Sequence, residues 1–262
     1  MDEGRYKQGE FCWHELGTRD IDTARQFYTT LMNWGTSSHD MGEYGIYYIF
    51  QLEGQDIGAG YTLCGPQFEG IPPHWMPYVW ADDVDATTAK VTECGGKIVA
   101  PAMDVPNVGR MAFIQDPQGA HLAIFTGREH QGAARLAPQP GTFSWTELMT
   151  TDAAAARRFY CRIWGWTFTE MPMGPGVTYT VFQLDGKAVA GMMQMGGAQF
   201  EGVPPNWLSY ISVPDCDADV AKASELGAKI LMPPQDVPGT GRFAVLEDPT
   251  GAVFAIIAFI PM

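Results

Sequence analysis

The chain has 262 residues, of which 46% are hydrophobic and 18% are charged, and its formal net charge is −14 at neutral pH. This composition is typical of a globular protein with a substantial core and excludes a disordered chain. The negative charge disfavours binding to nucleic acid and to anionic membranes, and no stretch approaches the roughly 18 apolar residues of a membrane span.

The first strand is predicted at Phe11–Leu16, followed by a helix over residues 21–32 that Asp20 caps. Strands are then predicted at Ile46–Leu52 and Asp56–Leu63, joined by the two-residue turn Glu53-Gly54. The connector QFEGIPPHW leads into the next predicted unit.

The second unit follows the same plan. A strand is predicted at Trp75–Trp80 and a helix over residues 84–94, which Asp83 caps. Three further strands are predicted at residues 97–100, 110–115 and 120–125, and the motif DPQG forms the turn between the last two.

The remainder of the chain repeats this first part at a fixed offset. FCWHELGTRD at Phe11 matches FSWTELMTTD at Phe143, and QFEGIPPHW at Gln67 matches QFEGVPPNW at Gln199. The pattern indicates a tandem duplication, with a first domain at residues 1–126, a linker rich in Gly, Ala and Pro at residues 127–140, and a second domain at residues 141–262.

Each half contains two βαβββ modules, so the chain has four. One such module has a sheet with one uncovered face, and pairing two modules buries it. We therefore predict an α+β fold with cupped mixed β-sheets in two homologous halves and the helices outside.

These features resemble the vicinal oxygen chelate superfamily of glyoxalases, bleomycin-resistance proteins and extradiol dioxygenases. The resemblance is carried by the motif D-x-x-x-A-x-x-F-Y at Asp20 and Asp152, by the endings DPQGA and DPTGA, and by the βαβββ plan. It covers essentially the whole chain. A chain of this kind is similar to a glyoxalase dimer fused into one polypeptide, which implies a monomer and leaves a homodimer open.

The resemblance also implies a divalent metal held by His, Glu or Gln on the first and last strands of each module. The matching positions are occupied by residues that cannot bind such an ion. They are Trp13, about Gly60, Met76 and Ala123 in the first half, and Trp145, about Met192, Leu208 and Ala255 in the second. We therefore predict no cofactor and no metal.

One alternative places a divalent metal on a shifted pair, His74 and His121, with Glu15 or a water as a further ligand. The copy has Asn206 and Val253 at these positions, so only one such site could exist. The same two histidines could equally be polar residues at the edge of a pocket.

Strand alternation then predicts what faces the concave side. Phe11, Trp13 and Glu15 share one face of their strand, and their copies are Phe143, Trp145 and Glu147. His14 points toward the helices. Other candidates for this face are Tyr78, Trp80, Phe125, Tyr210 and Ser212, with Tyr47, Phe50, Tyr179 and Phe182 from the middle strands.

Arg110 and Arg242 have three possible roles. They could pair with Glu15 and Glu147, they could grip a ligand carboxylate, or they could serve a structural role. Aromatic residues on a sheet also often belong to the core rather than to a binding site.

Two functions fit this pattern. The first is a protein that binds a small hydrophobic or cationic aromatic molecule without a metal, with Trp13, Trp145, Tyr78, Tyr210, Trp80 and Phe125 as contacts. The second is an enzyme, a lyase, isomerase or oxygenase-like protein acting on an aromatic or polyketide-like metabolite, in which Glu15, Glu147 or His121 transfers protons.

The expected location is cytoplasmic. The first residues, MDEGRYKQGE, lack the apolar segment of a signal peptide, and the five cysteines include no Cys-x-x-Cys pair. A third possibility is a structural or interaction module whose concave face is filled by its own side chains.

Overall fold

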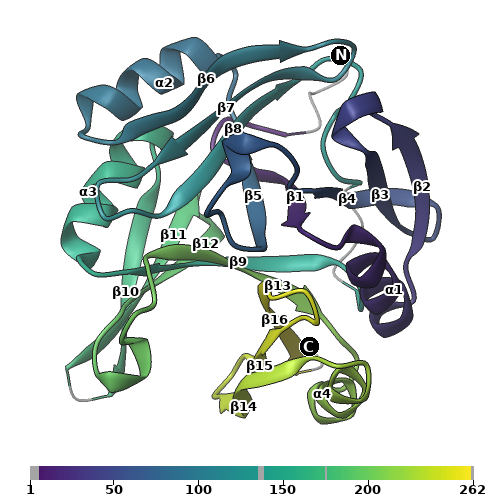
Figure 1. The fold of residues 1–262 in the computed structure, drawn as a ribbon. Helices are drawn as coiled ribbons and strands as arrows, with labels where there is room; N and C mark the ends of the chain where they lie inside the picture. The colour runs from purple at the N-terminus through teal and green to yellow at the C-terminus, as the bar shows by residue number, and fades with distance from the viewer. Residues whose placement is uncertain (1–5, 135–138, 175, 261–262) are drawn as a thin grey trace. The chain divides into compact units, whose positions relative to one another are not determined.

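The computed structural model describes residues 6–134, 139–174 and 176–260. These residues form the predicted βαβββ module four times along the chain (Figure 1). The first module contains β1 (Phe11–Thr18), α1 (Ile21–Met32), β2 (Gly35–Asp40), β3 (Ile46–Leu52) and β4 (Gln55–Thr62). The second contains β5 (His74–Trp80), α2 (Val84–Glu93), β6 (Lys97–Val105), β7 (Gly109–Gln115) and β8 (His121–Gly127).

The second half repeats these elements. The third module contains β9 (Phe143–Thr150), α3 (Ala153–Trp164), β10 (Thr167–Gly174), β11 (Val177–Leu184) and β12 (Lys187–Gln194). The fourth contains β13 (Asn206–Ser212), α4 (Cys216–Glu225), β14 (Lys229–Val237), β15 (Gly241–Glu247) and β16 (Val253–Phe259).

The strands form two mixed sheets of eight strands each, which confirms the predicted fold class. The strand orders are β2-β3-β4-β1-β5-β8-β7-β6 and β10-β11-β12-β9-β13-β16-β15-β14. In each module the first strand runs parallel to the last, as β1 does with β4 and β5 does with β8. The remaining neighbours within a module are antiparallel, because short hairpins join them.

Local sequence signals account for the helix starts and the hairpins. The Asp20 side chain accepts a hydrogen bond from the Thr23 backbone N–H at 3.1 Å, and aspartates cap the other three described α-helices in the same way. Glu53 and Gly54 both have positive φ, 53° and 74°, as a type I′ turn requires. The predicted helix caps and hairpin turn are therefore confirmed.

Two edge strands, β2 and β10, were not evident from hydrophobic alternation. In β2 only Thr36 is half-buried and the other residues are exposed, while every residue of β10 is exposed. Apolar side chains on an edge strand that is exposed to solvent on both faces add little stability. The sequence of such a strand therefore carries no alternation of apolar and polar residues.

The chain divides into two compact units that do not follow the two halves of the repeat. One unit contains the residues up to Trp13, Pro77–Gly132 and Trp145–Leu208, and the other contains His14–Met76, Ala133–Ser144 and the residues from Ser209 onward. Each unit therefore combines one module from each half. The predicted boundaries at residues 126 and 141 describe the duplication, whereas packing groups the modules differently.

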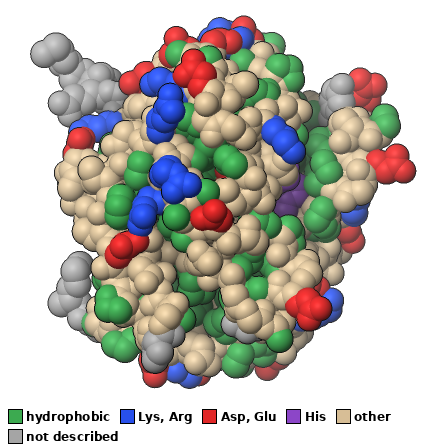
Figure 2. All heavy atoms as spheres, turned by 90° about the vertical axis from the view of Figure 1, so that its left-hand side faces the viewer, with side chains coloured by type: hydrophobic (Ala, Val, Ile, Leu, Met, Phe, Trp, Pro, Cys, Tyr) green, Lys and Arg blue, Asp and Glu red, His purple; other side chains and the backbone are tan. Residues whose placement is uncertain are grey.

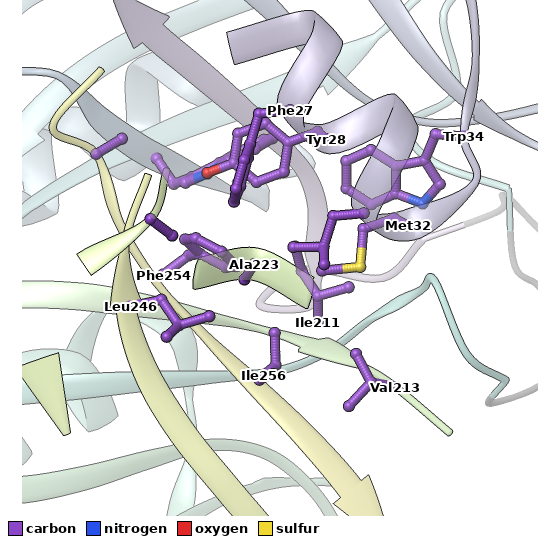
Figure 3. Close-up of a cluster of buried hydrophobic side chains, with 14 of the residues drawn as sticks. Phe27, Tyr28, Met32, Trp34, Ile211, Val213, Ala223, Leu246, Phe254 and Ile256 are labelled. Carbon is purple, nitrogen blue, oxygen red and sulfur yellow. The ribbon is translucent and has the colours of Figure 1, made fainter. Parts of the chain in front are cut away.

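The unit that begins at His14 has a core built mainly by the first and fourth modules, with Trp75 from the start of β5 (Figure 3). Helix α1 contributes Phe27 and Tyr28, and β16 contributes Phe254, whose ring centroid lies 5.3 Å from that of Tyr28. The Tyr28 hydroxyl accepts a hydrogen bond from Trp75 Nε1 at 2.8 Å and donates one to Asp248 Oδ2 at 2.9 Å. Buried polar groups are thus satisfied inside an apolar cluster.

The other unit has an equivalent core, built mainly by the second and third modules, with Trp207 from the start of β13. Here the Tyr160 hydroxyl accepts from Trp207 Nε1 at 2.9 Å and donates to Asp116 Oδ2 at 3.0 Å. The two hydrogen-bonded Trp–Tyr–Asp triads occupy equivalent positions in the repeat. Burial, and then the nearby carboxylate, raise the pKa of both tyrosines, so their hydroxyls stay protonated and can donate.

The structure also bears on the predictions about membrane spans and cysteines. No helix among the described residues is long and apolar enough to cross a membrane. All five cysteines carry free thiols, and burial raises the pKa of the Cys12, Cys161 and Cys216 thiols. Basic, acidic and hydrophobic side chains are interspersed on the face that Figure 2 shows.

Candidate functional site

The first candidate site is a carboxylate–phenol pair on strands β1 and β3. Tyr47 Oη donates a hydrogen bond to Glu15 Oε1 at 2.5 Å, and both residues are half-buried. Glu15 lies beside Ala59 of β4 in the parallel register, and Ala59 is fully buried. This acidic group, oriented by a phenol, can accept a hydrogen bond or a proton from a ligand.

Two further polar side chains lie near this pair. Burial, and secondarily the charge of Glu15, raise the pKa of Tyr61. A Cβ atom at Gly17 would lie 3.3 Å from Tyr61 Oη and 3.4 Å from a ring carbon of His74, so both side chains pass close to this glycine. Burial lowers the pKa of His74, so its imidazole is neutral at pH 7.

The second half contains the equivalent carboxylate–phenol pair, and the indole of Trp145 is hydrogen-bonded to it as a third member. Tyr179 Oη donates to Glu147 Oε2 at 2.6 Å and accepts from Trp145 Nε1 at 2.9 Å. Glu147 is only 7% exposed, while Trp145 and Tyr179 are half-buried. Burial, and then the charge of Glu147, raise the pKa of Tyr179, so the phenol remains a donor at neutral pH.

Gly191 of β12 explains why the indole can join the pair in the second half. It lies beside Glu147 in the register, and a Cβ atom there would lie 1.9 Å from Tyr179 Oη and 2.8 Å from Trp145 Nε1. The first half has Ala59 at this position. The methyl group of an alanine at residue 191 would clash with the Tyr179 hydroxyl and with the Trp145 indole. In the first half, which has this methyl group, Trp13 packs against His130 instead.

We therefore expect Gly191→Ala to displace the Tyr179 ring and to break the bond from Trp145. Overpacking of this kind costs about 1–3 kcal/mol of the free energy of unfolding. Chemical denaturation monitored by tryptophan fluorescence would measure the loss. Ala59→Gly in the first half is the matched control, since it removes a methyl group and creates no clash. Unchanged stability and fluorescence in Gly191→Ala would contradict the arrangement.

The two sites also differ in their other neighbours. The second half has Met149, Met193 and Asn206 where the first half has Gly17, Tyr61 and His74. The first site is therefore the more polar of the two. The second is lined by an indole and adaptable thioethers.

Four of the predicted ligand contacts are buried against one another instead of lining open space. The Trp13 ring meets the His130 ring edge-on with centroids 4.5 Å apart, and Phe125 packs against both Tyr78 and Trp80. These four predicted residues are at most 8% exposed. His130 of the predicted linker belongs to this cluster and was missed, because a linker carries no periodic signal. Tyr210 is likewise buried and packs near Phe243, with ring centroids 6.0 Å apart.

Four other aromatic residues were wrongly assigned to the concave face. Phe50 and Phe182 are fully buried in the two cores, since their positions alternate with those of Tyr47 and Tyr179. The remaining two, Phe11 and Phe143, begin their strands and pack onto core tryptophans: Phe11 on Trp166 and Trp207, and Phe143 on Trp34 and Trp75.

The histidines have separate environments. His14 is buried and stacks on Phe143 with a ring separation of 4.1 Å, as its predicted orientation toward the core requires. Burial lowers its pKa to about 3, so it is neutral at pH 7. His74 Nδ1 lies 2.8 Å from the Pro72 carbonyl oxygen. His121 is exposed and lies 3.4 Å from the Gln115 amide.

The residues at the superfamily's metal positions do not fit a divalent ion. Ala59 and Gly191 are the residues beside Glu15 and Glu147, which corrects the expected Gly60 and Met192 by one position. Gly60 faces the core side chains Ile21 and Phe50, and Met192 is itself a core residue.

The other expected positions, Ala123 and Ala255, pair with Tyr78 and Tyr210, and none of these alanines can coordinate a metal. Among the described residues there is no group of three or more His, Cys, Asp or Glu placed to hold one.

Arg110 and Arg242 bind carboxylates of their own modules. Arg110 makes two hydrogen bonds to Asp85, at 2.7 and 2.8 Å, and Arg242 makes two to Asp217, at 2.7 and 3.0 Å. These bidentate pairs tie the start of a helix to its sheet. The alternative pairing with Glu15 and Glu147 is wrong, and the arginines serve the predicted structural role.

Comparison with known proteins gives a consistent result. The family model "Glyoxalase/Bleomycin resistance protein/Dioxygenase superfamily" matches residues 13–124 and again residues 142–256. The chain is 38% identical over 257 residues to "Putative glyoxylase CFP32" of Mycobacterium tuberculosis (strain CDC 1551 / Oshkosh), covering 98% of this chain and 97% of that protein. It is 35% identical over 267 residues to "Anthracycline biosynthesis protein DnrV" of Streptomyces peucetius, covering 97% and 94%.

A solved structure shares the fold. The Mn(II)-bound glyoxalase from Novosphingobium aromaticivorans matches with a TM-score of 0.66 at 16% identity, covering 96% of this chain and 82% of that one. At this identity the likeness shows the fold alone.

Proposed function

Because the chain belongs to the glyoxalase/bleomycin resistance protein/dioxygenase superfamily, we propose that it binds a small planar aromatic molecule without a divalent metal. The binding groups are the two carboxylate–phenol pairs, Glu15–Tyr47 and Glu147–Tyr179. The two glutamates lie on β1 and β9, the first strands of their modules, where the resemblance implies metal ligands, and they are next to positions that hold Trp, Ala and Gly.

The observation that carries the proposal is the retention of the same polar pair in both halves. The two sites have diverged at Ala59 and Gly191 and at most neighbouring positions, yet each keeps a glutamate that accepts from a tyrosine. Placing a carboxylate away from bulk water is costly unless it is hydrogen-bonded. A merely structural position would be filled at lower cost by an apolar residue.

The chemistry of the pair selects the ligand class. A carboxylate has about four lone-pair sites on two oxygens, so beside the bond from the phenol it can also accept from a ligand hydroxyl or ammonium group. Half-buried rings at Trp145 and Tyr179 offer flat surfaces for an aromatic system and attract a cation. The net charge of −14 adds a weak general attraction for cations.

The name of one relative supports a polyketide-like aromatic ligand. The protein from Streptomyces peucetius that is 35% identical over nearly the whole chain is named for anthracycline biosynthesis. Anthracyclines are planar, carry phenolic hydroxyls and often an amino sugar. Those are the groups that a ring surface beside a carboxylate recognises.

The second candidate function is proton transfer at the first site. Tyr61 and His74 both pass close to Gly17, and the charge of Glu15, two residues before Gly17, contributes to the raised pKa of Tyr61. Of Glu15, Tyr61 and His74, the second half keeps only the glutamate. A general base with a neighbouring neutral imidazole suits an isomerase or a lyase acting on an enolisable aromatic ketone. In that case the first site turns over the ligand and the second only binds it.

A titration tests the proposed binding. The protein is treated with EDTA and titrated with a fluorescent anthracycline that carries a protonated amino sugar, and in parallel with its uncharged aglycone. We expect saturable quenching at one or two equivalents without added metal, and tighter binding of the charged form. No saturable binding, or binding that appears only after Mn²⁺, Zn²⁺, Ni²⁺ or Fe²⁺ is restored, would overturn the proposal.

Mass spectrometry of the same mixtures separates the two candidates. An unchanged mass and retention time after prolonged incubation supports binding alone. A new product that is lost in Glu15→Gln but retained in Glu147→Gln supports the enzyme.

A further inference from the structure

Arg19 fixes the connector between β4 and β5 in the first half. Its guanidinium group donates to the Leu63 carbonyl at 2.5 Å, to the Phe68 carbonyl at 2.5 Å and to the Ile71 carbonyl at 3.2 Å. Three backbone oxygens from different parts of the connector thus converge on one planar cation. Peptide carbonyls are good partners for a guanidinium because each supplies a lone pair to a fixed N–H fork.

The corresponding connector of the second half keeps the backbone but loses the arginine, because Thr151 stands at the position of Arg19. The hydrogen bond from Phe68 N to the Gly65 carbonyl recurs from Phe200 N to the Gly197 carbonyl, both at 3.2 Å.

Two further features of the connector are the same in both halves. The hydrogen bond from Leu63 N to the Thr18 carbonyl recurs from Met195 N to the Thr150 carbonyl, both at 2.7 Å. Gly70 and Gly202 have φ of 77° and 78°. The carbonyls of Met195, Phe200 and Val203 therefore keep the places of the three that bind Arg19.

A hollow of about 410 Å³ lies at this place in the second half. The residues that line it include Thr151, Met195, Gly196, Phe200, Glu201 and Val203. Four of these carry the equivalents of Arg19 and of its three acceptors. The hollow is thus lined by the counterparts of the arginine and of the residues that it binds in the first half.

We propose that this hollow is a binding site for a small guanidinium compound, which donates to the carbonyls of Met195, Phe200 and Val203. The site is distinct from the Glu147–Tyr179 pair and does not depend on the function proposed there. The first half contains the occupied form of the same site, with the cation supplied by the chain itself.

The lining selects a cation over an anion or a neutral ligand. Carbonyl oxygens present negative ends of dipoles, and the exposed carboxylate of Glu201 adds a full negative charge at the rim. An anion would be repelled by both. A planar guanidinium matches the acceptor arrangement that Arg19 satisfies, and Met195 and Phe200 provide apolar surface for a short alkyl group.

Nuclear magnetic resonance of methionine methyl groups tests the site directly. The protein is labelled with ¹³C at the methionine methyls, the Met195 signal is assigned with Met195→Leu, and methylguanidinium is titrated. We expect a saturable shift with half-saturation on the order of millimolar, since the site is open to solvent. Urea, a neutral molecule of the same shape, should respond roughly tenfold more weakly because its hydrogen bonds lack the charge.

Two substitutions complete the test. Thr151→Arg should supply the cation in cis and abolish the methylguanidinium shift, whereas Thr151→Val should preserve it. In the first half, Arg19→Thr should lower the melting temperature by a few degrees, and methylguanidinium but not urea should restore part of that loss. A linear shift, an equal response to urea, or an unchanged response in Thr151→Arg would overturn the proposal. If Thr151→Arg does not fold, failure of rescue in Arg19→Thr would overturn it.

Discussion

Replacing Asp116 with alanine is expected to lower the free energy of unfolding by about 3–5 kcal/mol. Asp116 Oδ1 accepts from the backbone N–H groups of Gln118, Gly119 and Ala120 at 2.7–2.9 Å, and Oδ2 accepts from Tyr160 at 3.0 Å. Alanine would leave these donors without their partner in a site where the side chain is 2% exposed. Equilibrium urea denaturation would measure the loss.

Asp116→Asn is the matched control, because its amide oxygen can still accept from the turn. We expect a cost well below that of alanine. Burial raises the pKa of Asp116, so the folded state binds a proton on this carboxyl more tightly than the unfolded state does. Its contribution to stability is therefore full below the unfolded pKa and declines as pH rises through the folded pKa. Asp116→Asn should flatten that part of the stability curve. Equal losses in both variants would contradict the hydrogen-bonding role.

The second large effect is expected on ligand binding. Glu147→Gln and Glu15→Gln keep the side-chain volume and remove the charge, so each should weaken binding of the charged anthracycline at its own site. The lost charge-assisted bond corresponds to roughly 10–100-fold in the dissociation constant. Binding of the uncharged aglycone should change less. Isothermal titration of each variant would resolve the two sites.

Glu53→Gln controls for the overall charge in these titrations. Glu53 is exposed at a hairpin turn, so its replacement makes the same change in net charge away from either pair. Its binding curve should match that of the unmodified protein at physiological salt. If Glu53→Gln weakens binding as much as Glu147→Gln, the attraction is a property of the whole surface and the proposed pairs have no specific role.

Much of the candidate site could be predicted because alternation along β1 and β9 is local. Alternation along β1 predicts that His14 points to the opposite side of the strand from Trp13 and Glu15. In the structure His14 stacks on Phe143, whereas Trp13 packs against His130. The middle strands were harder. Tyr47 and Phe50 are three residues apart and so lie on opposite faces, and only the paired register assigns the tyrosine to Glu15. A phenol's partner depends on a neighbouring strand, which local pattern does not specify.

The sequence by itself determined the duplication, the four βαβββ modules, the helix limits at Ile21–Met32, and the lack of suitable metal ligands at the expected positions. These follow from period, capping and residue chemistry, which are local. Only the tertiary structure decided that compact packing joins modules from different halves, that most predicted contact aromatics bury one another, and that a hollow remains where Thr151 replaces Arg19. Burial and close packing depend on residues distant in sequence, and no local pattern encodes them.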